Sequence, residues 1–216
     1  MNFKARKAYK DPVVASEYDK KRFHTPIGKI VDYLEKTTIE KAIKYISLPL
    51  NSKILDLPCG TGRISVFLSQ KGYTVTGGDI SQSMIKEAYK KTQKLNIDNK
   101  LSFHILDAEQ IGCPDKIFDA IVSLRFFGHI PPKIRIQILK EFKRVCKRYF
   151  IIAYYLKDSF QEIRRRKNRL NKKSDWYPVS LENIDQEMCQ AGIKKIKLFS
   201  ILRYFSETVI VIGEIE

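Results

Sequence analysis

The sequence is poor in the residues that build metal sites and disulfide frameworks. It has four cysteines and three histidines in 216 residues. None of the four (Cys59, Cys113, Cys146 and Cys189) belongs to a Cys-x-x-Cys pair or lies at ligand spacing from a histidine. This spacing does not predict a zinc site or any other metal site. We expect four free thiols, which are usual in a reducing compartment.

Long apolar runs and a targeting signal are also lacking. No run approaches the ~20 apolar residues that cross a bilayer. The segment 1–7 has no apolar core of the kind that a signal peptide needs. We therefore expect a cytosolic protein without a transmembrane segment. A chain of 216 residues is long enough to bury a large core without disulfides or metal.

Acidic residues are scarce relative to basic ones. The chain has 40 Lys and Arg against 24 Asp and Glu, a net charge of +16. The imbalance is concentrated between Lys133 and Lys173, where the acids are only Glu141, Asp158 and Glu162. A tract this basic attracts anions such as nucleic acid, an acidic lipid surface, a carrier protein or a phosphorylated metabolite. A solvated helix face is the alternative interpretation.

The hydrophobic pattern divides the chain into two parts. Apolar residues recur at helical spacing through residues 1–50, with a helix start at Thr25-Pro26, and this predicts a helical N-terminal cap. Residues 51–216 alternate short apolar runs with helical segments, the pattern of a parallel α/β sheet. The expected strands are 54–57, 73–76, 101–105, 118–124, 149–155, 195–202 and 208–212. The short connection between the last two predicts a hairpin and therefore an antiparallel last strand. The basic segment 156–178 has little apolar periodicity, and its length is typical of a lid-like insert.

A glycine-containing turn follows the first expected strand, in the stretch Ile54-Leu-Asp-Leu-Pro-Cys-Gly-Thr-Gly62. Glycines let a backbone approach a ligand without a Cβ between them. In a doubly wound sheet this turn lies at the carboxyl ends of the strands, where ligands bind. Gly60 and Gly62 are therefore expected to make room for a nucleoside-like molecule.

Three acids end three successive strands, and they define the ligand further. Asp56, before the glycines, would not help to bind a pyrophosphate but suits a cationic group. Asp79 ends the second strand, where a carboxylate can accept from both ribose hydroxyls. Asp107 ends the third and could accept from an adenine amino group. A ligand with an amino acid end, a ribose, an adenine and no phosphate corresponds to S-adenosylmethionine.

With these motifs the sequence resembles the class I, Rossmann-like S-adenosylmethionine-dependent methyltransferases, in particular the small-molecule branch of quinone-biosynthesis and natural-product enzymes. The resemblance covers about residues 27–215 and rests on "ILDLPCGTG", "VTGGDIS", "LDAEQI" and "FDAIVSLRFFGHIP". It implies a three-layer sandwich around a seven-stranded, mostly parallel sheet with an antiparallel last strand. The segment "YDKKRFHTPIGKIVDYLE" resembles the N-terminal cap of that branch.

The resemblance also assigns roles around the cofactor. Asp56 and the Gly60–Gly62 backbone would hold the methionine portion, with Tyr18 and Arg22 closing over it from the cap. Asp79 would take the ribose, while Asp107 and Ala108 would recognise the adenine edge and Met84 would cover its face. The remaining cofactor-binding residues expected from the same motifs are Pro58, Cys59, Ile80 and Leu124. Each of these residues could instead serve only the core or the turns.

On the acceptor side, His129 is the candidate catalytic base, because it stands in the loop after the fourth strand. The resembling family often has Glu-His at this place, whereas this chain has Gly128-His129. Arg125 could meet an anionic substrate. Aromatic side chains expected to line the acceptor pocket are Phe126, Tyr154, Tyr155 and Trp176, with core packing as the alternative for each.

The sequence therefore predicts a methyltransferase that acts on an oxygen, nitrogen or carbon atom of a small molecule. Two alternatives remain open. An RNA or protein methyltransferase would use the basic region 133–173 to bind an anionic polymer or carrier protein. A non-catalytic relative would act as a partner subunit. The sequence does not identify the acceptor or the oligomeric state.

Overall fold

The structure, a computed structural model, describes residues 11–93, 95, 100–169, 176–201 and 206–215, with the backbone alone for residues 165–169. The start of the expected cap, residues 1–10, and part of the expected insert, residues 170–175, lie outside this description. Within the described residues, no helix is both long enough and apolar enough to cross a membrane.

Seven strands of the described chain form one sheet in the order β3-β2-β1-β4-β5-β7-β6. The strands are β1 (Lys53–Asp56), β2 (Thr74–Asp79), β3 (Leu101–Ile105), β4 (Phe118–Ser123), β5 (Cys146–Tyr155), β6 (Ile193–Ser200) and β7 (Thr208–Ile215). β1 to β5 pair in parallel, and β7 runs antiparallel to both β5 and β6. The predicted mostly parallel sheet with an antiparallel last strand is confirmed.

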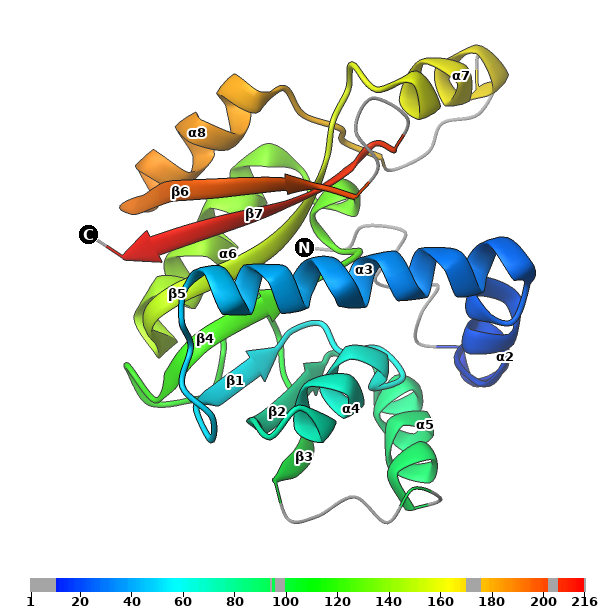
Figure 1. Ribbon diagram of the computed structural model, residues 1–216, viewed down its shortest axis with the longest axis vertical. Helices are drawn as coiled ribbons and strands as arrows, with labels where there is room; N and C mark the ends of the chain where they lie inside the picture. Colours follow the sequence, from blue (N-terminus) through cyan, green and yellow to red (C-terminus); the bar gives the residue numbers. More distant parts are fainter. Residues whose placement is uncertain (1–10, 94, 96–99, 170–175, 202–205, 216) are drawn as a thin grey trace.

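Helices cover both faces of the sheet (Figure 1). On one face lie α3 (Pro26–Tyr45), α4 (Arg63–Gln70) and α5 (Gln82–Gln93), and on the other lie α6 (Pro132–Val145) and α8 (Leu181–Gln190). Ile54 and Leu55 show why the two layers form, because neighbouring residues of a strand point to opposite faces. Ile54 packs in the core beside α3 and α4, and Leu55 packs in the core beside α6 and α8.

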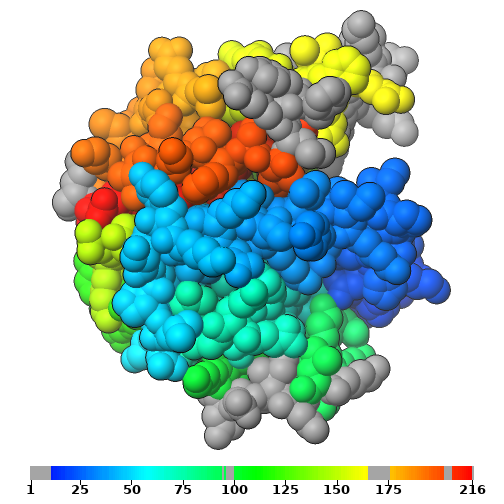
Figure 2. All heavy atoms as spheres, in the orientation of Figure 1, coloured from blue at the N-terminus to red at the C-terminus, as the bar shows by residue number. Residues whose placement is uncertain are grey.

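The described part of the N-terminal cap contains α2 (Pro12–Phe23) followed by α3. Asp11 and Thr25 cap the two helices by accepting from Val13 N at 2.8 Å and Gly28 N at 3.0 Å. A proline at the first turn of each helix adds to these start signals. In the space-filling view the blue cap helices form a continuous band across the molecule (Figure 2).

Two expectations from the sequence need correction. No helix was expected in the basic segment 156–178, but it contains α7 (Phe160–Arg169). The sequence signal for the start of this helix is local, because Ser159 caps it: Ser159 Oγ accepts from Glu162 N at 3.1 Å. Several strand bounds also differ: β2 extends to Asp79, and β5 begins at Cys146 rather than at Tyr149. The joining segment 201–207 is longer than expected, and residues 202–205 of it lie outside the described residues.

Candidate active site

A pocket opens at the carboxyl ends of β1, β2 and β4, where the strand order reverses between β1 and β4. This is the place where doubly wound sheets bind their ligands. Asp56 and Asp79 are the last residues of β1 and β2. The pocket is lined by Tyr18, Phe23, Asp56, Leu57, Pro58, Cys59, Gly60, Thr61, Arg63, Ile64, Asp79, Ile80, Met84, Leu106, Asp107, Ala108, Glu109, Leu124, Arg125, Phe126, His129, Ile130 and Ile138.

The two carboxylates at the strand ends are buried, with Asp56 2% and Asp79 7% exposed. Asp56 Oδ2 accepts from Ser65 Oγ at 2.5 Å. Asp79 accepts from Gly60 N at 3.0 Å and from Ser81 N at 2.8 Å. Burial outweighs these hydrogen bonds and raises the pKa of Asp56 to about 7 and that of Asp79 to about 6. Both carboxylates can therefore accept further donors or a cation.

The two glycines of the turn differ in what they make room for. A Cβ at Gly60 would meet no protein atom within 4 Å, so its backbone faces open space in the pocket. A Cβ at Gly62 would lie 2.7 Å from the ring of Phe103 and 3.1 Å from Ala88. Gly62 also has φ 76° at the start of α4. Gly62 therefore makes room for a side chain of β3, and its expected role toward a ligand stays a prediction.

The thiol of Cys59 belongs to the wall of the pocket and is not a candidate nucleophile. The residue is 7% exposed, and its backbone N donates to Gly78 O at 2.7 Å. Burial raises the pKa of the Cys59 thiol, and the nearby Asp56 and Asp79 raise it further. A nucleophilic cysteine needs the opposite shift. Its contribution is therefore to the shape of the turn.

Four further residues that were expected to bind the cofactor also line the pocket. Met84 is buried near the start of α5, and its backbone N donates to Ser81 Oγ at 3.3 Å. Asp107 Oδ1 accepts from Glu109 N at 3.1 Å, so this acid also turns the chain after β3. Ala108 and Leu124 complete the wall. The structure brings all four to one pocket.

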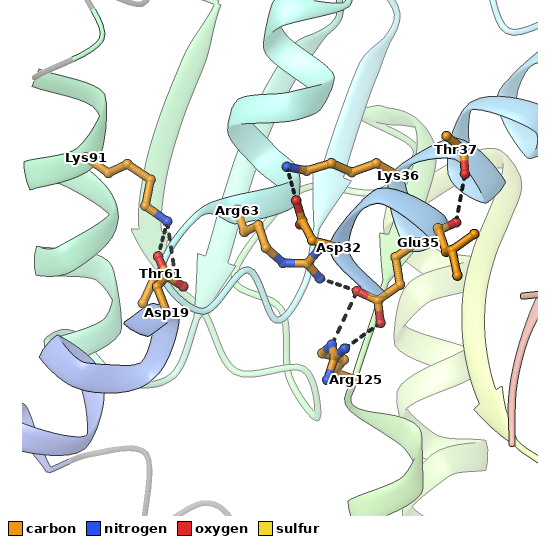
Figure 3. Close-up of polar contacts among 10 residues, drawn as sticks. Asp19, Asp32, Glu35, Lys36, Thr37, Thr61, Arg63, Lys91 and Arg125 are labelled. Carbon is orange, nitrogen blue, oxygen red and sulfur yellow. Dashed lines mark hydrogen bonds and ion pairs between the residues drawn. The ribbon is translucent and has the colours of Figure 1, made fainter. Parts of the chain in front are cut away.

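The cap is tied to the pocket by a network of ion pairs (Figure 3). Glu35 of α3 accepts from Arg63 Nη2 at 2.6 Å and pairs with Arg125 Nη2 at 2.9 Å. Asp32 accepts from Arg63 Nη1 at 2.5 Å. The Phe23 ring lies 4.2 Å from the Arg63 guanidinium and 5.0 Å from that of Arg125, within cation–π distance. We call Asp32, Glu35, Arg63 and Arg125 the cap latch.

A second contact fixes α2 on the glycine turn. Thr61 Oγ1 donates to Asp19 Oδ1 at 2.6 Å, and Lys91 Nζ lies 2.5 Å from Asp19 Oδ2 (Figure 3). Asp19 therefore joins the cap to both the turn and α5. Tyr18, its neighbour, lines the pocket, whereas Arg22 does not and instead lies over the Tyr18 ring at 5.7 Å.

Sequence reasoning missed the cap latch. Arg63 directly follows the glycine turn, and this position was a signal that was not used. Glu35 is 3% exposed on a helix whose other buried side chains are mostly apolar. A lone acid on the core face of an amphipathic helix indicates a buried cationic partner. The partner itself could not be identified from spacing, because Arg63 and Arg125 lie far along the chain.

On the acceptor side, the structure separates the expected residues. Arg125, Phe126 and His129 line the pocket, and Arg125 has φ 54°. Tyr154 does not line it, because this side chain is 1% exposed in the core and its ring lies 5.1 Å from Phe127. Tyr155 and Trp176 are not among its lining residues either, and their ring centroids lie 4.6 Å apart. The expectation that these three aromatic rings line the pocket is wrong for the pocket as the structure has it.

Known proteins resemble this chain over its central part. Residues 54–149 match a family described as "Methyltransferase domain". The chain is 33% identical over 154 residues to "Putative methyltransferase YqeM" of Bacillus subtilis (strain 168), covering 68% of this chain and 55% of that protein. It is 38% identical over 104 residues to "Ubiquinone/menaquinone biosynthesis C-methyltransferase UbiE" of Rickettsia akari (strain Hartford), covering 45% and 41%. The chain spans about half the length, or less, of these curated relatives.

A solved structure resembles nearly the whole chain. The magnesium protoporphyrin IX methyltransferase (ChlM) from Synechocystis PCC 6803, crystallised with bound SAH, superposes with a TM-score of 0.79 at 19% identity. The match covers 98% of each chain. At this identity the likeness shows a shared fold.

Proposed function

Since this chain carries a methyltransferase domain on a class I, Rossmann-like sheet, we propose that the protein transfers a methyl group from S-adenosylmethionine to a small-molecule acceptor. The observation that carries the proposal is the pair of buried strand-end acids, Asp56 and Asp79. Each has a pKa raised by burial and accepts only part of the hydrogen bonds that a carboxylate can take. A ligand with a cation and vicinal hydroxyls would supply what they lack.

The residues present fit S-adenosylmethionine. The ammonium of its methionine end would pair with Asp56, and its ribose hydroxyls would donate to Asp79. The open face of Gly60 leaves room for the ligand chain. Met84 and Ala108 would contact the adenine ring, with Asp107 at its edge. When bound, the cofactor supplies an electrophilic methyl group on a sulfonium.

The acceptor wall favours a neutral, largely apolar molecule. Its lining includes Phe126, Ile130 and Ile138. Arg125 was expected to meet an anion, but its charge is balanced by the buried carboxylate of Glu35. Burial disfavours the charge of Arg125, and the nearby Glu35 outweighs this and raises the pKa of Arg125. Arg125 is therefore bound to the cap and contributes little net attraction for an anionic acceptor.

His129 is the residue that we assign to proton transfer on the acceptor side. It lies on a short 3-10 turn (Phe127–His129) between β4 and α6 and reaches the pocket. Accepting a proton from a hydroxyl nucleophile would contribute roughly 10²–10⁴-fold. Holding the acceptor in line with the methyl group contributes more, about 7–11 kcal/mol in well-oriented systems. The apolar wall would provide this orientation.

The polymer alternative has weaker support. Several basic residues of the tract 133–173 are committed to acids within the fold: Arg144 to Glu141 and Asp115, Lys147 to Asp119, and Arg148 to Glu214. Arg135 is buried and cannot contact a polymer. The relatives named above refer to quinone biosynthesis and to magnesium protoporphyrin IX, and this fits a small acceptor. A cytosolic location remains a prediction.

The function is tested in two stages. Isothermal calorimetry with adenosylhomocysteine should give saturable binding, and the absence of binding would contradict the proposal. Methyl-labelled cofactor is then supplied with a panel of quinols, phenols and porphyrins, and with random RNA and an acidic carrier protein. We expect label in a neutral aromatic small molecule. Transfer to the RNA or the carrier alone would favour the polymer alternative.

A further inference from the structure

The turn that carries His129 is held by the adjoining helix α6 and by a segment far along the chain. Tyr177 N donates to Gly128 O at 2.7 Å. Arg135 Nη1 donates to Phe127 O at 3.3 Å and to Ile130 O at 3.0 Å. The carbonyls on both sides of His129 therefore accept hydrogen bonds from α6 and from the segment 176–179.

Arg135 connects this turn to α8. It is 1% exposed, and its guanidinium donates to Glu187 Oε1 at 2.6 Å through Nη2 and to Glu187 Oε2 at 2.9 Å through Nε. A further hydrogen bond of 3.1 Å goes from Nη1 to Tyr177 O. Because an unpaired buried charge is costly, this ion pair allows the surrounding backbone few alternative positions. The turn and the segment 176–179 are thus fixed to one another.

The side chain of Trp176 fills the space next to the turn. A Cβ at Gly128 would lie 2.6 Å from Tyr155 Cδ2 and 2.7 Å from Trp176 Cζ3. The indole therefore occupies the space that any larger residue at position 128 would need. Its ring centroid lies 5.1 Å from that of His129, with the planes at 66°. This edge-to-face arrangement is favourable for two rings.

The indole is itself held by α7. Trp176 Nε1 donates to Glu162 Oε2 at 3.0 Å, and Glu162 is only 1% exposed. Glu162 is placed by its backbone N, which donates to Ser159 Oγ at 3.1 Å. The hydrogen bond and the packing against Tyr155 fix the indole orientation. The His129 ring therefore has an ordered aromatic partner that is not among the residues lining the pocket.

We propose that Trp176 is a positioning residue for His129, and that Glu162 holds the indole in the orientation that this requires. The insert thereby belongs to the acceptor side of the site, although neither side chain lines the pocket. Only the link to methyl transfer rests on the proposed function, because the contact between the two rings is independent of any activity. Neither residue touches the cofactor side, so changing them should leave cofactor binding intact.

The first test needs no acceptor. The chain has three histidines and one tryptophan, so imidazole ¹H–¹³C spectra are simple to assign, with His129→Gln identifying the His129 signals. We expect Trp176→Leu to displace the His129 signals, because the ring current of the indole is removed, and to leave those of His24 and His104 in place. Glu162→Ala should displace the same signals by a smaller amount, because the indole stays but loses its tether. The matched control is Tyr45→Leu, which removes a ring from the edge-to-face pair Tyr45–Phe199 outside the pocket.

The second test is a double-mutant cycle on methyl transfer, with an acceptor found in the panel above. Trp176→Leu should lower kcat by about 10²-fold if it disables the proton transfer of His129. The same change in a His129→Gln background should have almost no further effect, and Trp176→Phe should restore part of kcat. Affinity for adenosylhomocysteine should change by less than about twofold. A tenfold change, which corresponds to about 1.36 kcal/mol of binding free energy, would show that the cofactor side is also affected.

Two outcomes would overturn the proposal. Unmoved His129 signals in Trp176→Leu would show that the rings are not in contact in solution, and this result stands even if the protein transfers no methyl group. Additive losses in the cycle would show that Trp176 acts independently of His129. If Trp176→Leu fails to fold, Trp176→Phe and Glu162→Gln retain the packing and provide the same two readouts.

Discussion

The two sides of the pocket are built in different ways. On the cofactor side, each acid stands at or just after the end of a strand: Asp56 and Asp79 are the last residues of β1 and β2, and Asp107 follows β3 by two residues. On the acceptor side, the turn that carries His129 depends on Arg135 and Trp176. These two side chains are held in turn by α8 and α7. One side is specified by local sequence, and the other is specified by tertiary contacts.

This difference indicates which side can vary without loss of the fold. A strand end and a glycine turn are fixed by the sheet itself, so the cofactor side is as rigid as the core. The acceptor wall is fixed by side chains from α6, α7 and α8, and a change in any of them can reshape it. Such a division suits a scaffold that keeps one cofactor and changes its acceptor.

The largest effect is expected where the two sides meet, at the cap latch. Glu35→Ala leaves Arg63 and Arg125 without their shared carboxylate, which is 3% exposed. Breaking a buried ion pair typically costs about 3–5 kcal/mol of unfolding free energy. Adenosylhomocysteine affinity should fall as well, because α2 and α3 would no longer be held over the pocket. Chemical denaturation and calorimetry measure the two effects.

The matched control for the latch is Glu40→Ala, on the same helix. Glu40 pairs with Lys71 at the surface, where ion pairs contribute little. If Glu35→Ala and Glu40→Ala destabilise the protein equally, the latch does not join the cap to the pocket. The cofactor side and the acceptor side of the pocket would then both be independent of the cap.

The second prediction concerns the cofactor side alone. Asp79→Ala should weaken adenosylhomocysteine binding by about 100-fold or more, because two hydrogen bonds to a charged group contribute roughly 1.5–3 kcal/mol each. Asp79→Asn, which keeps one oxygen acceptor, should lose less. Calorimetry measures both variants, with the surface variant Asp185→Ala as control. An affinity for Asp79→Ala equal to that of the wild type would refute the ribose assignment.

The fold could be predicted from the sequence because its signals are local and repeated. The apolar run of β4 and the helix start at Thr25-Pro26 both indicate their elements directly, and the structure confirms them. The helix α7 was missed because its residues are strongly basic and give little apolar periodicity. Its start depends on Ser159 and Glu162, a weak signal in a segment of that composition.

The site was predictable only in part, because only some of its residues are specified by local sequence. Asp56, Asp79 and Gly60 stand beside their strands, and the structure brings them to one pocket. Their roles toward the cofactor stay predictions. The close contact of Gly62 with Phe103 could not be predicted, because Phe103 comes from β3, far along the chain. Trp176 was expected to line the pocket, but its hydrogen bond to Glu162 holds the indole against the His129 ring. No spacing rule predicts either contact.

The third prediction addresses the acceptor side. Gly128→Ala places a Cβ 2.6 Å from Tyr155 and 2.7 Å from Trp176, so the rings must move. Overpacking of this kind typically costs about 1–3 kcal/mol of unfolding free energy. Thermal unfolding should show the loss, while adenosylhomocysteine affinity should stay close to that of the wild type. Gly60→Ala, whose Cβ would meet no protein atom but whose φ of 54° strains any L side chain, should lose about 1–2 kcal/mol of unfolding free energy through the backbone. Unlike Gly128→Ala, it should also bind the cofactor weakly, because its Cβ enters the pocket. Similar effects of both variants on cofactor binding would contradict the division into two sides.

The smallest expected effect is a pH dependence confined to the cofactor side. Burial raises the pKa of Asp56 to about 7 in the ligand-free protein, but pairing with an ammonium requires its ionised form. Adenosylhomocysteine affinity should therefore rise with pH, by about tenfold from pH 6 to pH 8, since one unit of pH below a pKa removes tenfold of the charged form. Binding should also release protons near pH 6.5, which calorimetry in buffers of different ionisation enthalpy detects.

The stability of the ligand-free protein should change with pH in the opposite direction. The folded state holds a proton on Asp56 that the unfolded state has already lost above about pH 4. The contribution of Asp56 to the unfolding free energy is therefore fully present below about pH 4 and is lost as the pH rises through about 7. Asp56→Asn should remove the component of both profiles near pH 7, keep the component near pH 6 that the raised pKa of Asp79 contributes, and leave the His129 signals unchanged. If the component of the binding profile near pH 7 persists in Asp56→Asn, Asp56 is not the group that titrates there, and the ammonium contact would have to be reassigned.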